Sequence, residues 1–248
     1  MGWRKRYYED GYLRRWTLGP PGASEDREAA ALLQLVGQSP PIRILDVGCG
    51  HGRLCKPLAD LGNTVVGLDA SLALLRRAVA QSADTPSRTS WVQGDMEALP
   101  FLRCFDLILV KDAFGHVESE GDDREFLRGT LGVLEPGGHL VLKNPNANSI
   151  RGGWKDELRE ERDGRTVLAT NQLDLSGRWL DQDLQIVESS GQHRYHRRQR
   201  LYDSTELTHL LESAGFDRVC HFADFDGAPL ADLSSTHIVT VSQRTSGS

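Results

Sequence analysis

The chain has 248 residues, of which 39% are hydrophobic and 26% charged, and this suits one globular domain with an elaboration. Its net charge of -6 argues against a nucleic-acid partner, because proteins that bind a phosphate backbone usually carry a basic surface. None of the four cysteines forms a C-x-x-C pair and no Cys/His spacing fits zinc, so we expect no metal site.

No apolar stretch approaches the ~20 residues that a membrane-spanning helix needs. The first residues, MGWRKRYYEDGYLRRW, are basic but are not followed by the apolar core of a signal peptide. These features predict a cytoplasmic protein.

From residue 24 to about 143, short β-like runs alternate with helical periods. Ser24 is predicted to cap a first helix, because acidic residues fill the turn that follows it. Further helices are expected over 52–61, after Ser71 and over 122–134, and strands over 42–48, 64–69, 89–93, 105–111 and 139–143. Such alternation predicts parallel strands joined by right-handed crossovers, with a ligand at their carboxyl ends.

The pattern changes after residue 143. Residues 144–164 are expected to form a loop and a short helix, and three alternating segments between 165 and 202 are expected to form a small antiparallel lid. Asp203 and Glu206 predict a capping box, with strands at 216–222 and 236–243 beyond that helix. The predicted units are an N-terminal flap (1–23), a core (24–144), an inserted lid (145–202), the rest of the core (203–243) and a disordered tail (244–248).

The strongest local motif is LDVGCGHGRL (45–54), a glycine-rich turn between a buried strand and a helix. Glycine lets the backbone approach a ligand closely, and the following helix offers free N–H groups. Dinucleotide sites use a similar loop with a ribose-binding acid about 20 residues later, so Asp69 alone does not separate the two kinds of site.

Three details favour another cofactor: the loop is G-x-G-x-G, Asp46 ends the first strand, and Gly94-Asp95-Met96 follows the third. Over residues ~42–143, the segments DVGCGHG, GLDAS, GDMEALPF and LEPGGHLVL occur in the order found in class I S-adenosylmethionine-dependent methyltransferases, which the chain therefore resembles. The resemblance implies a Rossmann-like α/β fold with a seven-stranded, mostly parallel sheet whose last strand is antiparallel.

The resemblance also implies S-adenosylmethionine as cofactor and a role for individual residues. Asp46 would lie near the methionine amino group, Asp69 would accept from the ribose hydroxyls, and Asp95 would accept from the adenine amino group. The implied cofactor residues are Asp46, Gly48, Cys49, Gly50, Asp69, Ala70, Asp95, Met96 and Lys111. The alternative is structural: the two aspartates cap turns and Met96 fills a gap.

Candidate acceptor residues follow the fourth strand and lie in the two flanking segments. His116 is a candidate general base, although a histidine bonded to nearby backbone is the more ordinary interpretation. Phe114 is expected to form a pocket wall rather than part of the core. In the lid, alternation places His193, Tyr195 and Arg197 on one face, where they would meet an anionic acceptor; a charged edge strand is the alternative.

The flap interleaves basic and aromatic residues, and Tyr8, Tyr12 and Trp16 are expected to line the pocket. The leading hypothesis is a methyltransferase acting on a hydroxyl or amine of a small molecule, such as a natural-product or sugar intermediate. The main alternative is an RNA or protein methyltransferase that uses the basic flap and lid. A cofactor-binding regulatory subunit and a dehydrogenase stay open as further alternatives.

Overall fold

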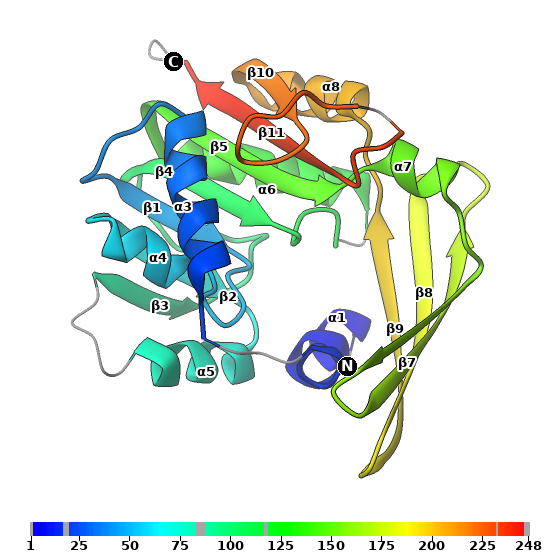
Figure 1. Ribbon diagram of the computed structural model, residues 1–248. Helices are drawn as coiled ribbons and strands as arrows, with labels where there is room; N and C mark the ends of the chain where they lie inside the picture. The colour runs from blue at the N-terminus through cyan, green and yellow to red at the C-terminus, as the bar shows by residue number, and fades with distance from the viewer. Residues whose placement is uncertain (1, 17–19, 83–87, 117–118, 232, 246–248) are drawn as a thin grey trace.

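The computed structural model describes residues 2–16, 20–82, 88–116, 119–231 and 233–245. Two sheets dominate it: a seven-stranded sheet flanked by helices, and a separate four-stranded sheet to its side (Figure 1). The N-terminal helical segment, in dark blue, lies between the large sheet's α5 side and the four-stranded sheet. No described helix combines the length and the apolar character needed to cross a bilayer.

The strands of the large sheet are β1 (Arg43–Val47), β2 (Thr64–Asp69), β3 (Thr89–Gln93), β4 (Phe105–Lys111), β5 (Leu134–Pro145), β10 (Phe216–Phe222) and β11 (His237–Arg244). The strands of the small sheet are β6 (Glu157–Arg162), β7 (Arg165–Leu173), β8 (Trp179–Glu188) and β9 (Gly191–Arg200). The helices are α1 (Trp3–Arg6), the π-helix η1 (Tyr7–Gly11), α2 (Tyr12–Arg15), α3 (Ala23–Leu35), α4 (Cys55–Asp60), α5 (Leu72–Ser82), α6 (Glu120–Val133), α7 (Ala147–Gly152) and α8 (Ser204–Ala214).

The large sheet has the order β10-β11-β5-β4-β1-β2-β3. Its central pairs are parallel, and β11 runs antiparallel to both β5 and β10. The expected seven-stranded, mostly parallel sheet with an antiparallel last strand is therefore confirmed. The order reverses between β1 and β4, where a crevice opens at the carboxyl ends of the strands and ligands bind in such folds.

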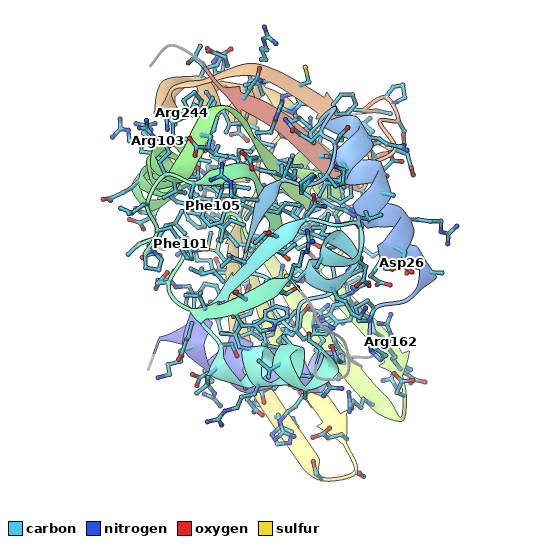
Figure 2. The ribbon with its side chains drawn as sticks, turned by 90° about the vertical axis from the view of Figure 1, so that its left-hand side faces the viewer. Asp26, Phe101, Arg103, Phe105, Arg162 and Arg244 are labelled. Carbon is cyan, nitrogen blue, oxygen red and sulfur yellow. The ribbon has the colours of Figure 1, made fainter. Side chains whose placement is uncertain are left out.

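Helices cover both faces of this sheet, which is why its central strands are apolar throughout. On one face, α6 and α8 contribute Phe126 and Leu211 to a buried cluster; on the other, α3 and α4 contribute Leu32 and Leu58. Figure 2 shows how densely side chains fill the interior. These two layers hold the carboxyl ends of β1, β2 and β4 in fixed positions.

The small sheet is the expected antiparallel lid, with the order β6-β7-β8-β9. Along β8, the even-numbered residues from Leu180 to Ile186 are buried and the odd-numbered residues are more exposed, so only one face is covered. The covered face packs against the N-terminal helices: Tyr7, which is 1% exposed, lies in a cluster with Leu184, Ile186 and Tyr195 of the lid.

Three local expectations were wrong. The first helix begins at Ala23 with Gly22 as its N-cap, because the Glu25 carboxylate accepts from the Gly22 N–H and also from the Ser24 hydroxyl. Residues 157–162 form strand β6 rather than loop: the segment is strongly charged, but pairing with β7 supplies its backbone hydrogen bonds.

The third correction concerns Arg244, which was assigned to a disordered tail. Arg244, labelled in Figure 2, ends β11 and is 5% exposed. Its guanidinium donates to the carbonyls of Leu131 and Leu134. Residues 246–248 of that predicted tail lie outside the described residues.

Candidate active site

One cavity of about 510 Å³ lies at the carboxyl ends of β1, β2 and β4, beneath the N-terminal helices. Its volume is in the range of small-molecule and cofactor sites. All of the sequence-predicted cofactor residues line it: Asp46, Gly48, Cys49, Gly50, Asp69, Ala70, Asp95, Met96 and Lys111. The flap contributes Arg4, Lys5, Tyr8, Glu9 and Tyr12 to the opposite wall.

Asp46 places a carboxylate at the bottom of this cavity, at the end of β1. The residue is only 4% exposed, and burial raises the pKa of its carboxyl from 3.8 to about 6. The Cys55 thiol donates to its Oδ2 at 3.2 Å. A buried carboxylate with so few donors is suited to pairing with a cation, such as the ammonium group of a bound ligand.

Asp69 ends β2 and joins two loops. Its Oδ2 accepts from the Gly50 N–H at 2.7 Å, and its Oδ1 accepts from the Ser71 N–H at 2.8 Å. Burial raises the pKa of this carboxyl. Each carboxylate oxygen has two lone pairs, so both oxygens retain capacity to accept from ligand hydroxyls. The structural interpretation of Asp69 and the ribose-binding one are therefore compatible.

The glycine loop is shaped for close approach by a ligand. Gly48 has a φ of +70°, and a Cβ there would lie 2.5 Å from the Cβ of Ala113, so a side chain is excluded. Gly50 also has a positive φ, of +58°, but a Cβ there would meet nothing within 4 Å, so its backbone borders open space. This open cradle with carboxylates at both sides fits a nucleoside that carries an amino-acid tail.

Residues after β3 and at the end of β4 complete the part of the cavity that the predicted cofactor residues line, which we name the cofactor half. Asp95 is exposed and its Oδ1 accepts from the Glu97 N–H at 3.1 Å, whereas Met96 packs partly against the core. The Lys111 ammonium points to Glu28 of α3, which also pairs with Lys143 at 3.0 Å. With its side chain engaged there, Lys111 has its backbone left to face a ligand.

Tyr8 of the flap and His116 of the loop after β4 also line the cavity, in the part that we name the acceptor half. Their rings meet edge to face with centroids 5.7 Å apart, and Trp3 meets His116 at 6.4 Å. The Nδ1 of His116 lies 3.3 Å from the carbonyl oxygen of Arg198, so a proton on Nδ1 would be donated to that carbonyl. Burial, reinforced by the charge of Arg197, lowers the pKa of His116 to about 3.

Phe114 is a correction: it was expected in the pocket wall but is fully buried. It stacks on Tyr202 with centroids 5.3 Å apart and contacts Phe126 of α6, because the loop after β4 turns this side chain toward the α6 layer. Ala113, directly before it, and His116, two residues after it, line the cavity instead.

The other expected substrate residues that lie outside the cavity wall are Trp16, His193, Tyr195 and Arg197. Trp16 lies between the guanidinium groups of Arg15 and Arg162, at 5.0 and 5.2 Å from its ring. Tyr195 packs against the flap and donates to Asp10, and His193 lies 3.4 Å from Glu188. These side chains join flap and lid rather than line the cavity.

Three cavity residues, His51, Arg53 and Leu54, were missed from the sequence although they lie within the quoted glycine motif. His51 is 4% exposed, and burial lowers its pKa to about 4. Arg53 lines the cavity too, and its guanidinium pairs with Glu25 of α3. Their position in the motif was a usable signal, but the direction of each side chain was not readable from it.

Comparison with known proteins matches residues 44–138 to a family model described as a methyltransferase domain. The ubiquinone biosynthesis O-methyltransferase of Bradyrhizobium sp. (strain ORS 278) is 32% identical over 130 residues, covering 52% of this chain and 47% of the relative. The chain spans about half the length of the curated relatives it matches.

Solved structures resemble the chain over nearly all of its length. The CcbJ methyltransferase of Streptomyces caelestis is 23% identical with a TM-score of 0.78, covering 97% of this chain and 96% of that one. The amino pentose methyltransferase CalS10 of Micromonospora echinaspora, solved with S-adenosylmethionine bound, is 19% identical with a TM-score of 0.64, covering 96% of each. Residues 44–138 therefore match a methyltransferase domain, and the chain as a whole shares the fold of these methyltransferase structures.

Proposed function

We propose that this protein transfers a methyl group from S-adenosylmethionine to a hydroxyl or amine of a small molecule. The observation that carries the proposal is that one cavity joins the carboxylates and glycines of the cofactor half to the aromatic side chains of the acceptor half. The activities named for similar proteins, which include ubiquinone biosynthesis and amino-sugar methylation, support a small acceptor.

When bound, the cofactor supplies an electrophilic methyl group, and the chain's own residues have to align an acceptor with it and exclude water. Asp46 and Asp69 would hold the amino and ribose groups, as the resemblance implies, and Asp95 and Met96 the adenine. Tyr8 and Tyr12 would cover the acceptor, and burial raises the pKa of both phenols, so each is a neutral hydrogen-bond donor.

His116 is poorly suited to act as a general base, since its pKa is lowered to about 3. A base of such low proton affinity gives little driving force for abstracting a proton from a neutral alcohol. An amine in its neutral form, or an acidic hydroxyl, needs no strong base. His116 would then orient the acceptor through a hydrogen bond or through ring contact.

The basic residues of the flap argue for a small acceptor over RNA. Arg4 pairs with Glu97, Arg14 with Asp10 and Glu188, and Arg15 with Glu160. Cations already paired with carboxylates contribute little to binding a phosphate backbone.

The first test is calorimetric titration with S-adenosylhomocysteine, with NAD as the matched control. The second test is incubation with S-adenosylmethionine and one of two acceptor probes, catechol or an amino sugar. Binding of S-adenosylhomocysteine alone and a mass increase of one methyl group on a probe are the expected results. Binding of NAD instead would overturn the cofactor assignment, and methylation of RNA but of neither probe would favour the polymer alternative.

A further inference from the structure

A row of polar side chains crosses the covered face of the lid. Asn171 of β7 pairs with Gln182 of β8, and Gln182 pairs with Arg197 of β9, so the three lie side by side on adjacent strands. Two residues along each strand lies a second row on the same face, which is buried and packs against the flap. Its members are Ala169, Leu184 and Tyr195. Buried polar groups are costly unless something hydrogen-bonds to them, so a polar row in this position requires an explanation.

Arg197 is the only charged member of this row, and the row residues beside it are neutral. Asn171 and Gln182 are each 7% exposed, Gln199 is 2% exposed, and the Gln182 amide donates to Asn171 Oδ1 at 2.8 Å. The Arg197 guanidinium donates one hydrogen bond, to Gln199 Oε1 at 2.6 Å, whereas its Nε is buried without a partner among the described residues.

No carboxylate in the described part of the chain forms an ion pair with Arg197. Two nearby cations do have a carboxylate partner: the Nε of Arg198, on the opposite face of β9, lies 3.7 Å from Asp181 although it likewise makes no hydrogen bond, and Arg14 of the flap pairs with Glu188. A partly buried guanidinium with unused donors is energetically unfavourable in isolation, which indicates that an anion completes it in the working complex.

Arg197 is not among the residues that line the cavity, but it lies near two side chains that do, Tyr8 and His116. Its charge acts on both Tyr8 and His116, the flap and loop residues whose rings meet there. His116 is further tied to β9 through the Arg198 carbonyl, the residue next to Arg197. An acceptor lying against Tyr8 and His116 would therefore place a substituent within reach of the polar row.

We propose that the acceptor carries an oxyanion, a carboxylate, phenolate or phosphate, which pairs with Arg197 while the neutral amides of the row and the Tyr8 hydroxyl supply further hydrogen bonds. The proposal rests on the proposed function, since it concerns the second substrate of the same cavity. The guanidinium would orient the acceptor by bidentate pairing and would also favour an ionised acidic hydroxyl, which needs no strong protein base.

The experiment uses the full chain saturated with S-adenosylhomocysteine and a matched pair of probes, 3,4-dihydroxybenzoate and 3,4-dihydroxybenzamide, titrated calorimetrically. The wild type is expected to bind the acid about tenfold or more tightly than the amide, because hydrogen bonds to charged groups contribute that much. Arg197→Gln should abolish this preference, and Arg197→Lys should keep part of it.

Arg194→Gln is the matched control, because Arg194 lies on the same strand but on the exposed opposite face. It should leave the preference for the acid unchanged. The proposal is overturned if the wild type shows no preference for the acid, including binding of neither probe, or if Arg197→Gln retains the preference. Failure to bind S-adenosylhomocysteine would instead overturn the proposed function, so the two failures are distinguishable.

Discussion

The Asp46→Asn variant should be more stable than the wild type at neutral pH and bind the cofactor less well. Asp46 is 4% exposed, and burial raises the pKa of its carboxyl from 3.8 to about 6. At about 1.4 kcal/mol per unit, ionising this group costs the folded state about 3 kcal/mol at neutral pH. Asparagine keeps a similar shape and an acceptor oxygen for the Cys55 thiol but carries no charge.

The sign of the pH dependence follows from the raised pKa. Between about pH 4 and pH 6, folded Asp46 holds a proton that the unfolded chain has released, so its contribution to stability is lost as the pH rises. Of this contribution to the free energy of unfolding, about 1 kcal/mol is already lost by about pH 4.5. About 2 kcal/mol more is lost between about pH 4.5 and about pH 7.5. The variant lacks this loss, and other titrating groups are common to both proteins.

Urea unfolding followed by tryptophan fluorescence, at about pH 4.5 and about pH 7.5, measures both proteins without ligand. We expect the stability difference between variant and wild type to grow by about 2 kcal/mol in favour of the variant over this interval. A difference that is the same at both pH values refutes the reasoning. In parallel, calorimetry should show about tenfold or more weaker binding of S-adenosylhomocysteine to the variant, because the partner of its ammonium group is lost.

Three further outcomes are expected. Gly52→Ala should lower the free energy of unfolding by roughly 2 kcal/mol in urea melts, because Gly52 has a φ of +79° and a Cβ there would lie 2.2 Å from the tryptophan ring of β3. Gly37→Ala is the control, because Gly37 has a φ of +64° but open space around it. The control should lower the free energy of unfolding by about half as much. Tyr195→Phe removes the hydroxyl that donates to Asp10, so limited proteolysis should cleave the flap faster; an unchanged cleavage rate would show that apolar packing alone holds it. In NMR titrations, the imidazole signal of His116 should not shift between about pH 5 and about pH 8, since burial and a neighbouring guanidinium lower its pKa to about 3, and a midpoint near 6.5 would contradict its burial.

Much of the large sheet was predictable because its signals are local. The expected ranges of β2, β3, β4 and β10 coincide with the observed strands, since each is a short segment with β-branched or aromatic residues bounded by turn residues. The capping box at the start of α8 and the glycine that ends it were also predicted, and both depend on neighbours within a few residues.

The residues of the cofactor half were equally predictable from the sequence. Glycines needed at positive φ, and acids at the ends of successive parallel strands, are restricted to particular positions along the chain. The fold then brings those positions to one edge of the sheet, which explains why the whole predicted set lines one cavity.

Which side chains reach the acceptor half was decided by the tertiary structure. Phe114 and His116 are two residues apart in one loop, yet one is in the core and the other in the cavity, because the neighbouring α6 layer accepts the phenyl ring. Strand β6 exists because β7 pairs with it, despite its charged sequence. Alternation along β9 separated Arg197 from the other arginines of its strand, but the neutral side chains beside it come from pairing with β8 and β7. Motifs and periodicity report on neighbours along the chain, whereas the direction and pairing of these side chains depend on segments that are distant in sequence.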